Sequence, residues 1–269
     1  PFNGKRDLEK GIVNFIGDPD QRMKEDYLRI LRYFRFFLNL SKHEHDPKLL
    51  KKIKINIEGV SRLSKERLFD ELKKLINLKN LEKLSRDKAT LEILLIIFPE
   101  LKFLNFFSKV NLYPIKFLEK LDFILLLSLI VIDGSDNADY FLYKFNLSKK
   151  DQKRIKIIDN FFKENVNSKT FQEKNIDKFF YLQGKQATID VINFKLMKSK
   201  RFDTNLFELS ETYKNKKTPI MPIKAEMLIS KFNIPEGKIL GDKLKQIEQE
   251  WIKNDFQISE DQVKSIVQN

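Results

Sequence analysis

Apolar residues recur along the chain every three or four positions, the spacing that places them on one face of a helix. The alternation of apolar and polar residues that indicates strands is not sustained in any segment. Proline and glycine, the residues that most often interrupt helices, occur only 8 times each in 269 residues. The pattern therefore predicts an all-α fold, and we expect its helices to form an elongated array.

Capping residues locate several of the predicted helices. Asp18 suits an N-cap and Pro19 the first helical position, so a continuous helix is expected from there to about Leu40. Ser64 and Ser148 mark two further helix starts. After the first of these, helices are predicted at residues 47–56, 64–75, 78–85, 88–97, 113–132, 137–145, 149–165, 175–183, 187–197 and 205–214.

The longest apolar stretch, residues 123–132, is too short to span a bilayer and is flanked by Asp122 and Asp133. It predicts a buried helix, and we expect no membrane partner. The chain has no cysteine, which excludes disulfides, thiolate metal sites and cysteine nucleophiles and fits a cytoplasmic protein. A net charge of +13 favours a polyanionic partner, although the lysine-rich composition of an AT-biased genome would produce a similar excess.

One predicted helix carries an unusual row of arginines. A helix turns by about 100° per residue, so Arg29, Arg32 and Arg35 form a contiguous cationic arc that ends beside Asp26, opposite an apolar face. Three neighbouring cations repel one another, and an anionic ligand would relieve this repulsion. The alternative is a solvated amphipathic helix with a single weak Asp–Arg pair.

The hydrogen-bond donors and acceptors of Asp26 and Arg29 suggest a second interpretation. An ionised Asp26 only accepts hydrogen bonds and Arg29 only donates them. Side by side, they match a base edge with an amino donor next to a ring-nitrogen acceptor, which cytosine and adenine both present. Uracil and guanine present a carbonyl beside an N–H and would leave buried groups unpaired. The pair could therefore select C and A without a nucleic-acid template.

Several motifs resemble class II CCA-adding enzymes and bacterial poly(A) polymerases. They are Phe2-Asn3-Gly4-Lys5-Arg6-Asp7-Leu8, Phe15-Ile16-Gly17-Asp18-Pro19 and Glu25-Asp26-Tyr27-Leu28-Arg29-Ile30-Leu31-Arg32. In that family the last motif is the protein template for incoming CTP or ATP. The resemblance implies that Asp26 and Arg29 pair with the base, that Arg32 and Arg35 complete the nucleotide site, and that Glu25 supports the pair.

Two later segments are also similar to the family. Residues 60–72 resemble a neck motif in which Glu66 and Arg67 would brace the template helix, although a capped first turn with a local ion pair explains them as well. Residues 235–241 are similar to the tail signature of bacterial members. There Gly237, Lys238 and Gly241 would contact RNA phosphate, although a plain turn before a helix is a common use of such glycines.

The resemblance implies three segments: a nucleotide-selecting neck at 1–85, a helical body at 86–218 and a tRNA-contacting tail at 219–269. We expect the metal-binding catalytic head to be absent from this chain, with no catalytic residue and no metal ligand here. Asp18 and Asp20 have the one-apart spacing of metal-binding carboxylates, but capping explains them, and the pair His43 and His45 lacks an evident third ligand.

The expected function is therefore the nucleotide-selecting and tRNA-binding part of a CCA-adding tRNA nucleotidyltransferase. Its substrates would be ATP and CTP, its partners tRNA and the head of the same enzyme, and Mg²⁺ would bind in that head. One alternative is a bacterial poly(A) polymerase, which shares the head and neck of the family. Another is a standalone helical RNA-binding protein without catalysis.

Overall fold

The computed structural model describes residues 4–77, 79–164 and 171–268. Within these ranges the secondary structure is helical, with no strand, so the predicted all-α class is confirmed. The predicted helix ends at Leu78 and Asn165, and the motif residues Phe2 and Asn3, lie outside these ranges.

The described residues divide into two compact units. The first comprises residues 1–165 and 193–204, and the second residues 166–192 and 205–269. The division into neck, body and tail stays a prediction. None of the described helices is long and apolar enough to cross a membrane.

The first unit consists of helices of varied length around an apolar core. Its elements are α1 (Gly4–Lys10), α2 (Pro19–Glu25), α3 (Leu28–Leu40), α4 (Pro47–Asn56), η1 (Ile57–Arg62), α5 (Lys65–Leu75), α6 (Leu81–Arg86), α7 (Lys88–Ile97), η2 (Leu104–Leu112), α8 (Ile115–Leu118), α9 (Phe123–Val131), α10 (Asn137–Phe145) and α11 (Lys149–Lys163).

Local sequence signals predict many of these elements correctly. The bounds of α4, α7 and α10 are as predicted, and Asp18, Ser64 and Ser148 accept the expected capping hydrogen bonds. The predicted single helix over 113–132 is wrong, because a turn separates α8 from α9. That turn brings Asp122 to the N-cap of α9, where it accepts a hydrogen bond from the N–H of Leu125 at 3.0 Å.

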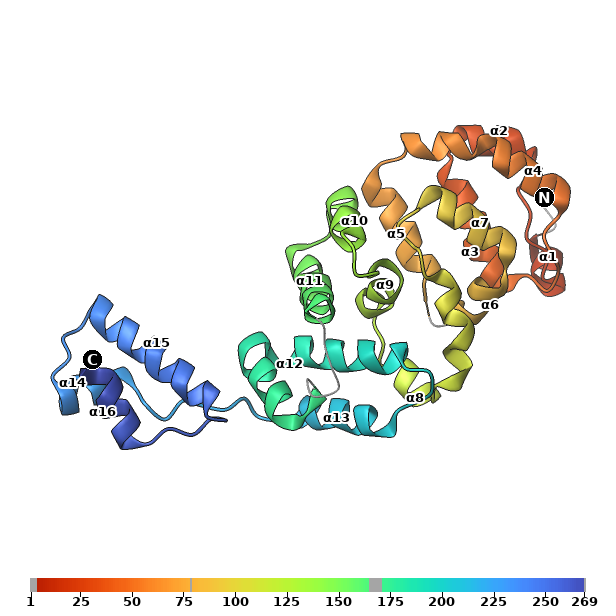
Figure 1. Cartoon of the computed structure of the whole chain (residues 1–269). Helices are drawn as coiled ribbons and strands as arrows, with labels where there is room; N and C mark the ends of the chain where they lie inside the picture. Colours follow the sequence, from red (N-terminus) through yellow and green to blue (C-terminus); the bar gives the residue numbers. More distant parts are fainter. Residues whose placement is uncertain (1–3, 78, 165–170, 269) are drawn as a thin grey trace. The chain divides into compact units, whose positions relative to one another are not determined.

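The apolar helix α9 lies in the core of the first unit and packs against α10 and α11 (Figure 1). Phenylalanine rings extend this core toward α5: Phe141 and Phe145 lie 4.6 Å apart, and Phe69 of α5 contacts both. Because aromatic side chains bury large apolar areas, these contacts hold α5 against α10. The prediction of a buried helix in the apolar stretch is confirmed.

His45 lies in a hydrogen-bonded, aromatic setting at the end of α3. Its Nδ1 is 2.8 Å from the hydroxyl of Tyr33, its Nε2 is 2.9 Å from Asp87, and its ring stacks on Phe37 at 3.5 Å. Burial, together with nearby carboxylates, raises the pKa of Tyr33, so this hydroxyl stays protonated. Both ring nitrogens of His45 are therefore engaged in holding α3 in place, and no group of three possible metal ligands converges among the described residues.

The second unit contains the start of α12 (Glu173–Lys198), followed by α13 (Thr204–Asn215), α14 (Ala225–Phe232), α15 (Lys238–Lys253) and α16 (Glu260–Gln268). Gly184, at φ 83°, kinks α12 between the two helices predicted there. The last three helices share a small core, formed by Leu228, Ile234, Leu240, Ile247 and Val263. Trp251 of α15 is buried beside Tyr181 of α12, with ring centres 5.3 Å apart.

Candidate functional site

The segment that carries Asp26 is a break between two helices. α2 ends at Glu25, Asp26 has an extended backbone (φ −156°, ψ 104°), and α3 begins at Leu28. The predicted continuous helix from Pro19 to Leu40 is therefore wrong, and so is the position of Asp26 on its helical arc. The physical reason is local, because the carboxylate of Asp26 accepts a hydrogen bond from the N–H of Leu28 at 3.1 Å and so starts a new helix.

Asp26 pairs with Arg67 of α5. Nη2 of Arg67 lies 3.0 and 2.9 Å from the two carboxylate oxygens of Asp26. Ser64 caps α5 and thereby orients the turn that carries Arg67. The structure thus brings Arg67 to the segment with which the sequence associated it. Glu66 is exposed and forms no ion pair with any residue that the structure describes.

Arg29 is bound to the end of α2 and not to Asp26. Its Nη1 donates to the carboxylate of Glu25 at 2.7 Å and to the carbonyl of Arg22 at 2.8 Å. Glu25 also accepts a hydrogen bond from Arg22 at 2.6 Å, so one carboxylate holds two guanidinium groups. The predicted side-by-side pair of Asp26 and Arg29 is absent from this structure. Sequence reasoning missed Arg22, whose signal was its spacing of three from Glu25 and seven from Arg29.

Glu71 of α5 is a buried carboxylate behind the arginine row. Its side chain is 1% exposed, forms an ion pair with Arg35 and lies 4.0 Å from Nε of Arg32. Arg35 also stacks over the ring of Phe36, with its guanidinium carbon 4.3 Å from the ring centre. Sequence reasoning missed Glu71, although its place among Leu68, Leu72 and Leu75 on the apolar face of α5 was a signal for a buried acid.

A pocket of about 250 Å³ opens in front of this row. Three guanidinium groups and several aromatic rings surround it, and its lining residues are Val13, Asn14, Phe15, Ile16, Arg22, Arg29, Arg32, Tyr33 and Phe36. Arginines present planar, multiple donors to phosphate and carboxylate oxygens, and aromatic rings stack on planar ligands. The pocket is therefore suited to a planar, anionic ligand. Asp26 and Arg35 lie outside its lining.

The predicted tail residues lie in the second unit at the start of α15. Gly237 precedes the helix with φ 130°, a conformation that favours glycine, and Lys238 is its first residue. Gly241 lies in the first turn with an ordinary backbone. A Cβ added at Gly241 would meet no atom within 4 Å, so packing within the chain does not require a glycine there.

Comparison with known proteins shows similarity to CCA-adding enzymes over most of the chain. Over 274 residues the chain is 28% identical to the human mitochondrial CCA tRNA nucleotidyltransferase 1. This match covers 99% of this chain and 60% of the relative. Over 260 residues it is 24% identical to the CCA-adding enzyme of Staphylococcus aureus, covering 92% of this chain and 61% of that enzyme.

A family model and two solved structures also match the chain. Residues 44–104 match a family model described as the probable RNA and SrmB-binding site of polymerase A. The fold resembles that of the Bacillus stearothermophilus CCA-adding enzyme, solved in complex with CTP, with a TM-score of 0.69, 16% identity and coverage of 100% of this chain and 67% of that one. It also resembles the Thermotoga maritima CCA-adding enzyme complexed with tRNA, with a TM-score of 0.60 and 20% identity. The chain spans about 60% of the length of the curated relatives.

Proposed function

We propose that this chain is the nucleotide-selecting and tRNA-binding part of an enzyme that adds C and A to the 3′ ends of tRNA. The observation that carries the proposal is the pocket lined by Arg22, Arg29 and Arg32, beside the break that holds Asp26. Three guanidinium groups at one concave surface match the triphosphate and base of a nucleotide better than they match a neutral ligand. The curated relatives, which carry the name of this activity, support the same function.

Asp26 and Arg29 remain our candidates for base selection, although they do not pair with each other. A carboxylate has about four lone-pair sites, so Asp26 can keep Arg67 and still accept from the amino group of cytosine or adenine. Arg29 uses only Nη1 for its bonds within the described residues, which leaves Nη2 and Nε to donate to a ring nitrogen. Binding would then require a small movement of Arg29 and not a new fold.

The other arginines divide into two roles in this proposal. Arg22 and Arg32 line the pocket and are 40% and 44% exposed, so both present guanidinium N–H groups that can donate to phosphate oxygens. Arg35 is only 20% exposed and is held by the buried Glu71. We therefore assign Arg35 to positioning α3 and not to direct contact with the nucleotide. Glu25 holds Arg22 and Arg29 in place.

The metal chemistry of nucleotidyl transfer belongs to the catalytic head in this proposal. In the family, carboxylates of the head would hold Mg²⁺, which would support nucleotidyl transfer from the triphosphate. Among the described residues no three His, Asp or Glu side chains converge, so they do not fit this metal. ATP and CTP as substrates, the head as a partner and a cytoplasmic location stay part of the proposal.

A bacterial poly(A) polymerase is the second candidate function. The match of residues 44–104 to a model described for polymerase A favours it. An Asp–Arg pair accepts adenine as well as cytosine, so the pocket alone does not separate the two activities.

Incubation of the full-length protein with tRNA that ends before CCA, with each triphosphate supplied alone and together, tests the proposal. We expect CTP alone to add two residues and ATP to follow only on that product. Incorporation of ATP alone, in long runs, would exclude CCA addition in favour of poly(A) synthesis. No incorporation together with tight tRNA binding would support a non-catalytic RNA-binding protein.

A further inference from the structure

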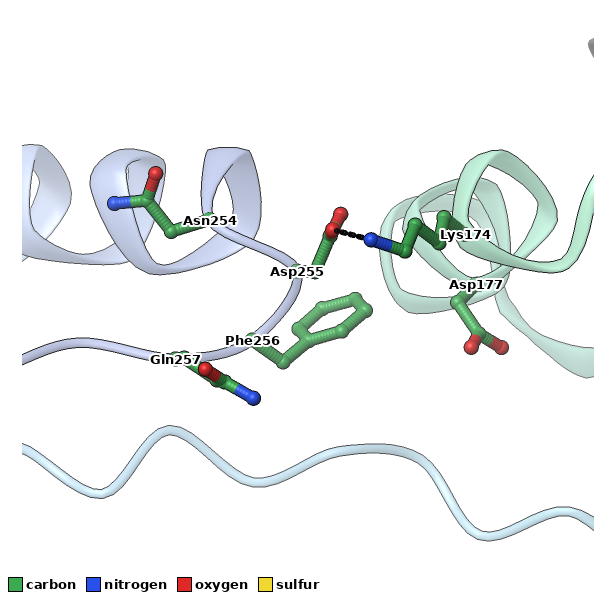
Figure 2. Close-up of a pocket in the computed structure, with 6 residues that line it drawn as sticks. All are labelled: Lys174, Asp177, Asn254, Asp255, Phe256 and Gln257. Carbon is green, nitrogen blue, oxygen red and sulfur yellow. Dashed lines mark ion pairs between the residues drawn. The ribbon is translucent and has the colours of Figure 1, made fainter.

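The second unit contains a pocket whose lining includes none of the residues that the proposed function uses. Its volume is about 380 Å³, and it is lined by Lys174, Asp177, Asn254, Asp255, Phe256 and Gln257 (Figure 2). The first two come from α12 and the other four from the segment after α15. A cavity of this size accommodates a small planar ligand.

Phe256 is held in the pocket at a conformational cost. Its φ is +64°, and that of Asp255 before it is +54°, so two successive non-glycine residues adopt the left-handed region. The ring contacts Trp251 and Tyr181 at centre distances of 5.0 and 5.7 Å, in edge-on and tilted geometries. Figure 2 shows this ring directed into the space between the loop and the helix that carries Lys174. Phe256 is half-buried and lines the pocket, so part of its ring is available for stacking.

The carboxylates of the pocket are already paired with lysines. Asp255 lies 2.8 Å from Nζ of Lys174 and 2.9 Å from Nζ of Lys178, and these contacts lower its pKa. Asp177 is bound by Lys216. Three lysines therefore face two aspartates, and the side chain of Lys174 is 77% exposed. This balance favours a ligand that carries negative charge.

The geometry points to one unpaired nucleobase of an RNA as the ligand of this pocket. The base stacks on Phe256, the amides of Asn254 and Gln257 supply both donors and acceptors for its edge, and Lys174 binds the adjoining phosphate. RNA recognition commonly uses such a combination, because unpaired bases expose both their faces and their edges. The inference rests on the proposed function, in which this chain binds tRNA.

Trp251 makes the proposal directly measurable. It is the one tryptophan of the chain and lies next to Phe256, so a base stacked on that ring changes its fluorescence. We would titrate the protein with single-stranded oligoadenylate and oligouridylate, with the mononucleotides AMP and UMP, with a blunt RNA duplex and with inorganic phosphate. We expect a saturable change with the single strands, weaker binding of the mononucleotides and no change with duplex or phosphate. A response to mononucleotides as tight as that to the single strands would overturn the assignment to RNA.

Two variants and a matched control test the residues. Phe256→Leu keeps an apolar side chain against Trp251 but removes the planar face, and we expect about tenfold weaker binding of the single strands. Lys174→Ala removes the exposed phosphate contact and should weaken binding by about threefold to tenfold at low salt. Lys264→Ala removes a 52% exposed lysine outside the pocket and should leave the affinity within about twofold.

The same proteins separate this inference from the proposed function. If wild type binds tRNA and both pocket variants bind single strands as tightly as wild type does, the pocket assignment fails and the proposed function stands. If wild type binds neither tRNA nor single strands, both fail. A loss of binding in Lys174→Ala, with an unchanged unfolding temperature, supports the pocket even where Phe256→Leu is poorly folded.

Discussion

Arg67 donates hydrogen bonds to both carboxylate oxygens of Asp26 at 3.0 and 2.9 Å, across 41 positions of the sequence. Asp26 lies in the extended link between α2 and α3. The pair with Arg67 and the hydrogen bond from Leu28 therefore set its direction before a nucleotide arrives. Such preorganisation reduces the side-chain entropy that the protein loses when a base binds.

Arg67→Ala should impair nucleotide selection more than stability. The pair is partly exposed, since Arg67 is 47% and Asp26 is 22% exposed, so its loss should change the free energy of unfolding by only about 0.5–1 kcal/mol. The kcat/KM for CTP and ATP should fall by about tenfold, because Asp26 is no longer oriented. Steady-state kinetics and urea unfolding measure the two effects. Arg86→Ala, which removes a 64% exposed arginine from its pair with Glu82 in α6, is the matched control and should leave kcat/KM unchanged.

Asp26→Ala and Arg29→Ala should abolish the preference for C and A while tRNA affinity stays within about twofold of wild type. The base edge loses one of its two partners in each variant, whereas no phosphate contact to RNA is removed. Misincorporation of UTP and GTP, measured with each triphosphate alone, reports selection, and filter binding reports tRNA affinity. A loss of tRNA binding comparable to the loss of selection would contradict this division of roles.

Local signals predict the helices well and the site only in part. Caps and apolar spacing define α4, α7 and α10, because these features act over one or two helical turns. The break at Asp26 depends on one hydrogen bond, in which the carboxylate of Asp26 accepts from the N–H of Leu28. This local bond competes with a continuous helix, which the apolar pattern supports equally well. The partners Arg67 and Glu71 reach α2 and α3 from 36–41 positions away, and no helical period encodes such contacts.

Glu71→Ala should destabilise the protein by about 2–3 kcal/mol. The carboxylate is 1% exposed, and its removal leaves the partly buried Arg35 without its ion-pair partner. Glu71→Gln retains a hydrogen-bond acceptor and should lose less. Urea unfolding monitored by far-ultraviolet circular dichroism measures the difference. Asp70→Ala, an exposed neighbour on the same helix, should stay within about 0.5 kcal/mol of wild type, and an equal effect of the two alanine variants would argue against a specific role for Glu71.

Gly241→Ala should stabilise the protein and weaken tRNA binding. Alanine is the better helix former by about 0.5–1 kcal/mol, and its Cβ meets no atom of the chain within 4 Å. If RNA phosphate approaches the backbone there, the same methyl group obstructs it. We expect a higher unfolding temperature with a Kd for tRNA raised several-fold. Gln246→Ala lies about 140° around the helix and should leave the Kd unchanged. An unchanged Kd in Gly241→Ala would remove this glycine from the RNA contacts.

Asp133 makes the stability of the first unit depend on pH. Burial raises the pKa of this carboxyl, but hydrogen bonds from Lys102 and Ser135 outweigh burial and lower the pKa from 3.8 to about 2. A carboxyl whose pKa is lower in the folded state stabilises that state above its unfolded value of 3.8, and this contribution is lost as the pH falls toward 2. Asp133→Asn should therefore be less stable than wild type at pH 7, and the difference should narrow steadily between about pH 4 and 2. Urea unfolding at several pH values in that range tests this, with Asp136→Asn, whose side chain is 100% exposed, as the control. A difference that stays constant from pH 7 to pH 2 would show that Asp133 contributes through packing and not through its charge.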